Sequence, residues 1–410
     1  MNYNIIEKFL LNHIYEVLRI KEYIFIHPEL AFHEYKSSEV IKQNLKKNGF
    51  SIFEVENINT AFIAKFGNGS PVIAILGEYD AVDGTNGPFH GCGHDLLASG
   101  SLLAALILKD FLESSDTLKG TIMFFGCPAE ETGEGKVYMS ENGAFKNVDI
   151  ALTWHPHNLN YVNNNTTLTM QTGLYNFHGK SSHAGSTPFL GRSALDAAEL
   201  MNVGANFLRE HIPPLSQIQY SYINSGSTSP NVIPDLSVVK YMVRSVDLNQ
   251  ANEIFKRVDN VAIGASIMTG TTVEAHHDLM CKNIKINKVI NKILYESLKS
   301  CLTYKKFKNY KLQSLLDKSL KTNIKPNNKV SVAFVSSDLG NVSQIVPTGQ
   351  FFLASWVNGT EFHSTSVVAQ NKEEYVNSSI INAALILADA AIKIYSEPSI
   401  YISAKKEMKE

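Results

Sequence analysis

The sequence has few cysteines, almost no net charge and no long apolar run, and each of these excludes a class of protein. Four cysteines in 410 residues, widely and unevenly spaced, do not form the disulfide framework of a small secreted protein. A formal net charge of −2 gives no overall attraction to nucleic acid or to a membrane surface. One of the longest apolar runs, residues 102–108, is far shorter than the ~18–20 residues of a membrane span.

The N-terminal segment also lacks the features of a secretory signal. Residues 1–17 are interrupted by polar side chains and contain no small-residue cleavage site. The sequence therefore predicts a cytoplasmic protein with reduced cysteines and with no nucleic-acid or membrane partner. Because 410 residues exceed one typical domain, two domains are expected.

Short apolar runs and helical patterns alternate along the first part of the chain. Runs at 71–77, 120–127 and 149–155 are typical of strands that are buried on both faces. Helical patterns separate them, at 95–112 and 135–145. This order predicts an α/β fold, with a mostly parallel mixed sheet and helices on both of its faces.

A second pattern interrupts this one. Residues 173–283 have the order β-α-β-β-α-β, which predicts an inserted ferredoxin-like α+β domain. The α/β pattern then resumes, with strand-like residues at 330–335, a strand at 351–357 and a long apolar helix at 373–395. The expected domains are therefore 1–172 together with 284–410, and the insert 173–283.

Side chains that bind metals or transfer protons follow each predicted buried strand and also the last one, at the edge of an α/β sheet where ligands bind. Taken singly, each has an ordinary structural explanation, such as a solvated loop for the Glu130-Glu131 pair. Together they supply five donors, more than one tetrahedral zinc ion needs from protein, which predicts two divalent cations with Cys92 or a water between them. The candidate donors are Cys92, His94, a glutamate of the Glu130-Glu131 pair, His155 and His363.

Other acidic residues are candidates for supporting roles. The glutamate of the 130–131 pair that does not bind a metal could act as a general base on a metal-bound water. Asp80 and Asp95 could accept imidazole N–H bonds and so orient the ligand histidines. The cysteine donor favours zinc, but a mixed nitrogen, oxygen and sulfur site also binds manganese.

With these residues in view, the sequence resembles the aminoacylase, carboxypeptidase and indole-acetyl-amino-acid hydrolase family of metallopeptidases. The resemblance covers almost the whole chain, and within the family it is strongest to hydrolases of p-aminobenzoyl-glutamate. The motifs that carry it are His27-Pro28-Glu29-Leu30 with Glu34, Gly77-Glu78-Tyr79-Asp80-Ala81, Gly91-Cys92-Gly93-His94-Asp95, Pro128-Ala129-Glu130-Glu131, Trp154-His155-Pro156, Ser182-His183-Ala184 and Pro230-Asn231-Val232-Ile233-Pro234.

The resemblance implies a zinc-peptidase-like catalytic domain with an inserted lid and dimerisation domain. It implies that Glu131 is the ligating glutamate and that Glu130 is the general base and acid. His183 would stabilise the oxyanion, often in the partner subunit's site, while Asn231 and Arg244 would grip the substrate carboxylate. By residue type alone, His183 could instead be a surface residue, Asn231 a turn residue and Arg244 an ion-pair partner.

The expected function is a dinuclear-metal amidohydrolase of N-acyl amino acids or dipeptide-like substrates with a free carboxylate, such as p-aminobenzoyl-glutamate. It would act as a homodimer joined through the lid domain, with a second hydrolase subunit as a further partner. Two alternatives stay open. One is a dipeptidase for dipeptides with a basic C-terminal residue, and the other is a non-catalytic subunit of a hetero-oligomeric hydrolase.

Overall fold

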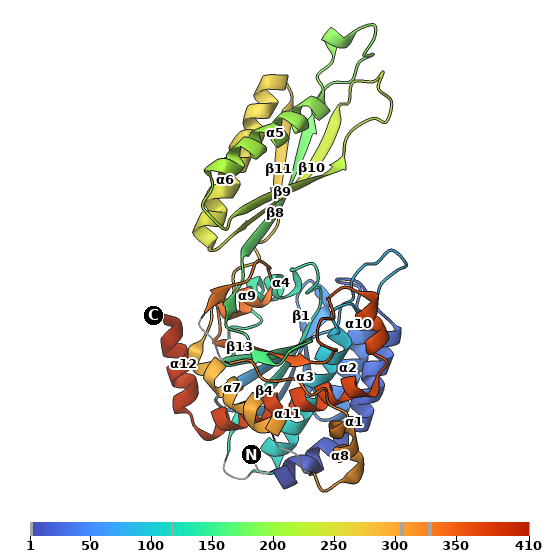
Figure 1. Cartoon of the computed structure of the whole chain (residues 1–410). Helices are drawn as coiled ribbons and strands as arrows, with labels where there is room; N and C mark the ends of the chain where they lie inside the picture. The colour runs from blue at the N-terminus through green and yellow to red at the C-terminus, as the bar shows by residue number, and fades with distance from the viewer. Residues whose placement is uncertain (1–2, 116–117, 304–306, 327–329, 410) are drawn as a thin grey trace. The chain divides into compact units, whose positions relative to one another are not determined.

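The computed structural model describes residues 3–115, 118–303, 307–326 and 330–409. It divides into two compact units (Figure 1). Unit 1 comprises Met1–Thr166, Lys285–Ser331 and Asn341–Glu410, and unit 2 comprises Thr167–Ile284 and Val332–Gly340. The chain therefore leaves unit 1 to form unit 2 and returns, as the interrupted α/β pattern indicated.

Unit 1 is built on a seven-stranded mixed sheet. Its four central strands, β4, β3, β5 and β13, are parallel, while the strands at both edges are antiparallel to their neighbours. The α/β prediction is confirmed, with the parallel pairing confined to the centre of the sheet. In sheet order the strands are β1 (Ser51–Val55), β2 (Ile58–Asn68), β4 (Gly120–Cys127), β3 (Val72–Glu78), β5 (Ile150–His157), β13 (Thr348–Ala354) and β6 (Tyr161–Val162).

Helices cover both faces of this sheet (Figure 1). Helix α3 is buried along most of its length and packs on β3 and on α11. Helix α11 is long and apolar enough to cross a membrane, but 83% of its most apolar stretch is buried, as in the core helix of a folded domain. The helices are α1 (Tyr3–Ile26), α2 (Tyr35–Lys47), α3 (His94–Glu113), α4 (Gly135–Glu141), α7 (Lys288–Thr303), α8 (Tyr310–Asp317), α9 (Leu339–Ser343), α10 (Thr365–Gln370), α11 (Glu374–Ser396) and α12 (Ser399–Lys409).

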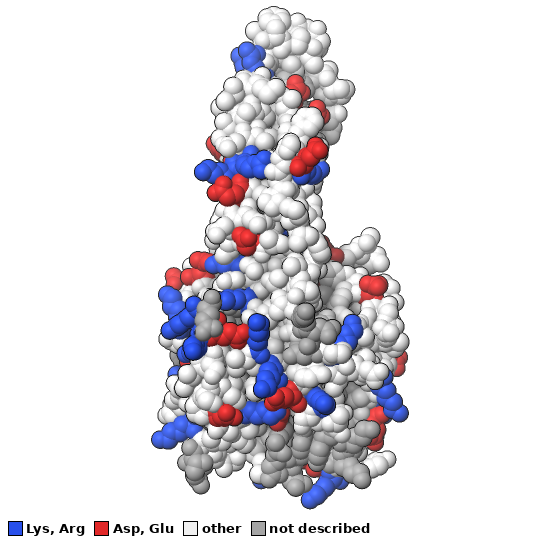
Figure 2. Space-filling model, turned by 60° about the vertical axis from the view of Figure 1, so that its left-hand side comes forward, with Lys and Arg blue, Asp and Glu red and all other residues white. Residues whose placement is uncertain are grey.

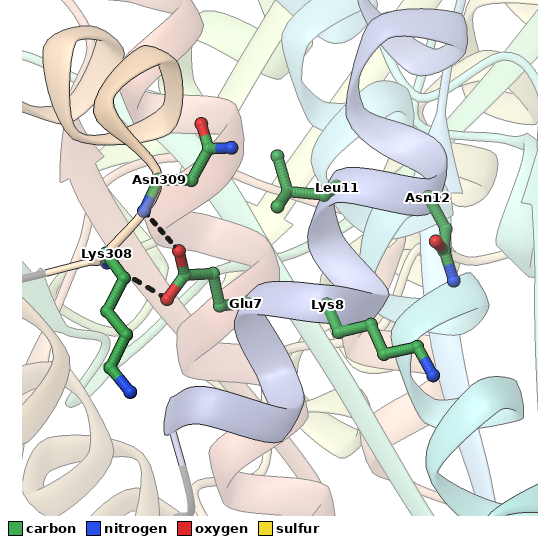
Figure 3. Close-up of a pocket in the computed structure, with 6 residues that line it drawn as sticks. All are labelled: Glu7, Lys8, Leu11, Asn12, Lys308 and Asn309. Carbon is green, nitrogen blue, oxygen red and sulfur yellow. Dashed lines mark hydrogen bonds between the residues drawn. The ribbon is translucent and has the colours of Figure 1, made fainter.

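A buried carboxylate attaches helix α8 to helix α1. Glu7 accepts hydrogen bonds from the backbone N–H groups of Lys308 and Asn309, just before α8 begins (Figure 3). The Asn309 side chain then caps α8 by accepting a hydrogen bond from the Leu312 N–H. A carboxylate that accepts two backbone N–H groups from a distant segment fixes that segment's position.

The strand-like segment at 330–335 is much shorter in the structure. Only β12 (Ser331–Val332) forms there. Phe334 and Val335 are exposed, so they lack the burial that stabilises a central strand.

Unit 2 is a four-stranded antiparallel sheet in the order β11-β8-β10-β9, with two helices packed on it. This strand order is that of the ferredoxin-like arrangement expected from the sequence. β8 begins before the expected boundary at residue 173, and residues 332–340 join this unit without any sequence pattern that indicated it. The elements are β8 (Thr169–His178), α5 (Ala194–Leu208), β9 (Gln217–Asn224), β10 (Leu236–Ser245), α6 (Leu248–Thr269) and β11 (Thr272–His277).

Candidate metal centre

Two of the predicted donors, Cys92 and His94, lie in and just after the loop that follows β3. The glycine between them, Gly93, allows the turn that places both side chains. Gly93 has φ +69°, and a Cβ there would lie 2.8 Å from the ring of Trp356. Only glycine fits this left-handed position without strain. The turn places Cys92 just before α3, and His94 becomes the first residue of that helix, with 1% of its surface exposed.

His94 is held by Asp80. Its Nδ1 lies 2.8 Å from Asp80 Oδ1, and its Nε2 is buried without a hydrogen-bond partner among the described residues. Burial alone would lower the pKa of His94, but the charge and hydrogen bond of Asp80 raise it well above its usual value. An unpaired imidazole nitrogen at such a site is what a metal ligand presents before an ion binds.

Glu131, His363 and Cys92 meet on the other side of the cluster. His363 Nε2 lies 2.9 Å from Cys92 Sγ and 3.2 Å from Glu131 Oε2. Burial would raise the pKa of Glu131, but the His363 hydrogen bond and the charge of His94 bring it down to about 2. The backbone N–H of His363 donates to the Gly91 carbonyl, which attaches the C-terminal motif to the cysteine loop.

His155 supplies the donor from β5. Its Nδ1 lies 2.6 Å from the Pro156 carbonyl oxygen, and its ring meets that of His94 edge-on, with 5.6 Å between the ring centroids. Burial and the neighbouring charge of His94 lower the pKa of His155. A lowered pKa favours the neutral ring, the form in which an imidazole binds a metal.

The structure brings all five predicted donors together. Two groups have their ligand atoms within 4.8 Å of one another, and both groups contain Cys92. His94 belongs to one group and Glu131 to the other, and each has a buried side-chain atom, Nε2 and Oε1 respectively, without a hydrogen-bond partner among the described residues. This donor set fits two cations that share the cysteine sulfur. The groups are Cys92 with His94 and His155, and Cys92 with Glu131 and His363.

Glu130 lies beside the donors. Its Oε2 is 4.0 Å from His94 Nε2, and the two form a third group with Glu78. Glu78 ends β3 two residues before Asp80, and nothing in its local sequence distinguishes it as a site residue. Glu78 is buried in an ion pair with the equally buried Lys136, with Oε1 2.8 Å from Nζ. Lys136 thus supplies a fixed positive charge next to the cluster.

The two aspartates have different roles. Asp80 contacts a ligand imidazole as expected, and its Oδ2 also accepts a hydrogen bond from the Glu131 N–H. Both Asp95 oxygens instead accept hydrogen bonds from the Asn371 side-chain amide, and the backbone carbonyl of Asn371 accepts one from Lys21 Nζ. The expectation that Asp95 accepts an imidazole N–H therefore needs correcting, because its carboxylate joins α3 to the segment just before α11.

A family model described as peptidase family M20/M25/M40 matches the sequence over residues 74–393. The chain belongs to this peptidase family. It is accordingly a hydrolase of amide bonds, as the motifs predicted.

The chain is similar to two curated proteins and to a solved structure. It is 34% identical to one of the subunits of p-aminobenzoyl-glutamate hydrolase from Escherichia coli, over 95% of this chain and 91% of that protein. It is 28% identical to a Xaa-Arg dipeptidase of Mus musculus, over 82% and 73%. A dinuclear metal binding M20 peptidase of Bacillus subtilis has the same fold, with a TM-score of 0.62, 18% identity and coverage of 93% and 98%.

The remaining expected site residues lie in unit 2. His183 is exposed, and its Nδ1 accepts hydrogen bonds from the Gly185 and Ser186 N–H groups, which leaves the proton of a neutral ring on Nε2. The Ala184 N–H donates to the Asn231 carbonyl, so these two motifs adjoin. Arg244 is half-buried on β10, where its Nε lies 3.4 Å from Met242 Sδ.

Proposed function

We propose that this chain is a dinuclear-metal amidohydrolase of N-acyl amino acids or dipeptide-like substrates with a free carboxylate. p-Aminobenzoyl-glutamate is the first substrate to test, because the 34% identical relative is named for its hydrolysis. The observation that carries the proposal is the pair of three-donor groups that share Cys92, with the Glu130 carboxylate beside them.

Glu130 would move the proton during hydrolysis. Divalent cations bound by the five donors would lower the pKa of a coordinated water and polarise the substrate carbonyl. Glu130 would accept the proton of the attacking water and then deliver it to the leaving amine. Asp80 orients His94 and also accepts a hydrogen bond from the Glu131 N–H. It therefore fixes two groups next to Glu130, the His94 ring and the backbone of the following residue.

We assign substrate contacts to unit 2. A neutral His183 with its proton on Nε2 would donate a hydrogen bond to the oxyanion that forms at the carbonyl. Asn231 and Arg244 would bind the substrate carboxylate. The adjoining backbones of the His183 and Asn231 segments support a common role for these loops.

The proposed partner is a second copy of the chain, joined through unit 2. Helices α5 and α6 expose large apolar side chains that a helix facing only solvent rarely carries, and these support an interface. A second hydrolase subunit remains a further proposed partner, since a relative is named as one subunit of its enzyme. The exposed residues are Val203, Phe207, Ile263, Ile267 and Met268.

The proposal includes zinc or manganese as the cations and a cytoplasmic location, which the free cysteines support. Basic and acidic side chains are interspersed on the face seen in Figure 2, so this face offers no single-sign surface for a polyanion.

The second candidate function is a dipeptidase for dipeptides with a basic C-terminal residue, which the Xaa-Arg dipeptidase relative favours. A non-catalytic role is disfavoured, because the Glu130 position and every donor position are filled. The deciding experiment is a hydrolysis screen with metal-stripped protein to which zinc or manganese is returned. N-acyl amino acids, p-aminobenzoyl-glutamate and Xaa-Arg dipeptides are the substrates. Absence of turnover on all of them by metal-loaded protein would reject the proposal.

A further inference from the structure

Glu34 lies outside the metal-binding cluster but contacts the loop that carries Glu130. It is fully buried before α2. Its Oε1 accepts hydrogen bonds from two backbone N–H groups, at 3.0 Å from Phe32 and at 2.8 Å from Ala129. Phe32 and Ala129 both adopt left-handed conformations, with φ of +62° and +56°. One carboxylate oxygen therefore binds two non-glycine residues in the left-handed conformation, which is energetically unfavourable for them.

Ala129 is a fixed point of the loop after β4. Its carbonyl accepts hydrogen bonds from the N–H groups of Glu134 and Gly135 and from the Thr132 hydroxyl. The chain approaches itself so closely here that a Cβ on Gly135 would lie 1.7 Å from the Pro128 oxygen. The direction of the next residue, Glu130, depends on the conformation of Ala129.

Buried carboxylates hold the backbone on both sides of Glu130. Glu34 binds the N–H of Ala129, and Asp80 binds the N–H of Glu131. Asp80 also contacts His94, so its effects on the loop and on that donor cannot be separated. The Glu34 Oε1 hydrogen bonds go to backbone N–H groups and not to a metal donor, so replacing Glu34 removes no hydrogen bond to a candidate donor.

We propose that Glu34 is a positioning residue, whose Oε1 holds Ala129 in the left-handed conformation and thereby sets the directions of the Glu130 and Glu131 carboxylates. Without that acceptor, Ala129 relaxes toward a more favourable φ and both side chains turn with it. A displacement of about 1 Å at reacting groups costs on the order of 10²-fold in rate. The inference rests on the proposed function in one respect, namely that Glu130 is the base.

The test compares Glu34→Ala, which removes the acceptor, with Glu34→Gln, which keeps a carbonyl oxygen at the same position. For each, we would measure kcat and KM on the best substrate, and the visible absorption spectrum of cobalt-loaded protein. The spectrum reports donor geometry, including that of Glu131, without turnover. We expect Glu34→Ala to lower kcat by about 100-fold with little change in KM and to alter the spectrum. Glu34→Gln should stay close to wild type in both.

Glu7→Ala is the matched control. Glu7 is also buried, and it too accepts two backbone N–H groups from a distant segment, those of Lys308 and Asn309 (Figure 3). Glu7→Ala should therefore reduce stability as Glu34→Ala does, but it should leave kcat and the cobalt spectrum unchanged. If Glu34→Ala does not fold, Glu34→Asp is measured in its place. The aspartate side chain is one methylene shorter, so its carboxylate oxygen lies farther from the two N–H groups.

Two results would overturn the inference. One is a folded Glu34→Ala or Glu34→Asp protein with the wild-type kcat and spectrum. The other is a Glu34→Gln protein as defective as Glu34→Ala, because then the charge, and not the position of an acceptor, is what matters. If wild-type protein hydrolyses no substrate, the proposed function fails, and the cobalt spectra of the variants still decide the role of Glu34.

Discussion

Asp80 Oδ1 lies 2.8 Å from His94 Nδ1, and both side chains are buried. This contact places the imidazole proton on Nδ1 and directs Nε2 toward the other donors. The second Asp80 oxygen holds the Glu131 N–H. One carboxylate thus orients a candidate metal-binding histidine and the loop that carries Glu130.

Replacing Asp80 tests this double role. In Asp80→Asn, the amide oxygen can still accept from one group, but the fixed negative charge is lost. We expect metal affinity to fall by about 10- to 100-fold, the usual effect of losing the partner of a ligand histidine. Titration of metal-stripped protein against a competing chelator measures it, and unchanged affinity would show that Asp80 does not control His94.

Glu130→Gln should separate metal binding from catalysis. The amide cannot accept the proton of the attacking water, so we expect kcat to fall by about 10²- to 10⁴-fold. Glu130 is absent from both groups that share Cys92, so two cations per chain should still bind. Elemental analysis and steady-state kinetics on the same preparation check both statements. Near-native turnover in this variant would exclude Glu130 as the base.

Cys92 and His155 should differ in their effect on metal content. Cys92 belongs to two of the three-donor groups, whereas His155 belongs to only one of them. We therefore expect Cys92→Ala to weaken both cations and His155→Ala to weaken mainly one. Elemental analysis after dialysis at a series of buffered free-metal concentrations resolves the two sites. Equal losses from the two variants would contradict the assignment of the groups.

The buried Glu78–Lys136 pair predicts a stability effect. Lys136→Met leaves the Glu78 carboxylate buried without its 2.8 Å partner, and such changes destabilise by about 3–5 kcal/mol. Urea unfolding of metal-free protein measures the change. The double variant Lys136→Met with Glu78→Gln should recover much of the loss, because no charge is then left unpaired. A double variant no more stable than Lys136→Met would mean that Lys136 acts through other contacts.

Glu34 predicts how stability depends on pH. Burial, and then the negative charge of Asp80, raise the pKa of Glu34 from 4.5 to about 7 in the folded protein. The folded state therefore retains this proton more strongly than the unfolded state. The stability from this group is fully present below pH 4.5 and is lost as the pH rises through 7.

Glu34→Gln should remove that dependence. Relative to wild type, this variant should gain stability between pH 5 and 8, up to roughly 3 kcal/mol at 1.36 kcal/mol per pKa unit. Urea unfolding of metal-free protein at several pH values measures the difference. A constant difference between the two proteins across this range would contradict the raised pKa.

Much of the site could be predicted from the sequence because its donors follow strands. The carboxyl ends of parallel strands meet at one edge of a sheet, so residues after 71–77, 120–127 and 149–155 had to come together there. His363 was placed by the same argument after β13. The strand order of unit 2 likewise followed from the order of its elements.

Contacts between segments that are distant in sequence could not be predicted in this way. No local pattern pairs Asp95 with Asn371, Glu78 with Lys136, or Glu34 with Ala129. Burying a carboxylate costs free energy unless it is paired or hydrogen-bonded. Its partner is therefore the donor that the packing of the domain places next to it, which the local sequence does not show. The sequence by itself determined which side chains gather at the sheet edge. Tertiary structure alone decided which carboxylates face the metal site and which hold the surrounding backbone, because burial depends on the packing of the whole domain.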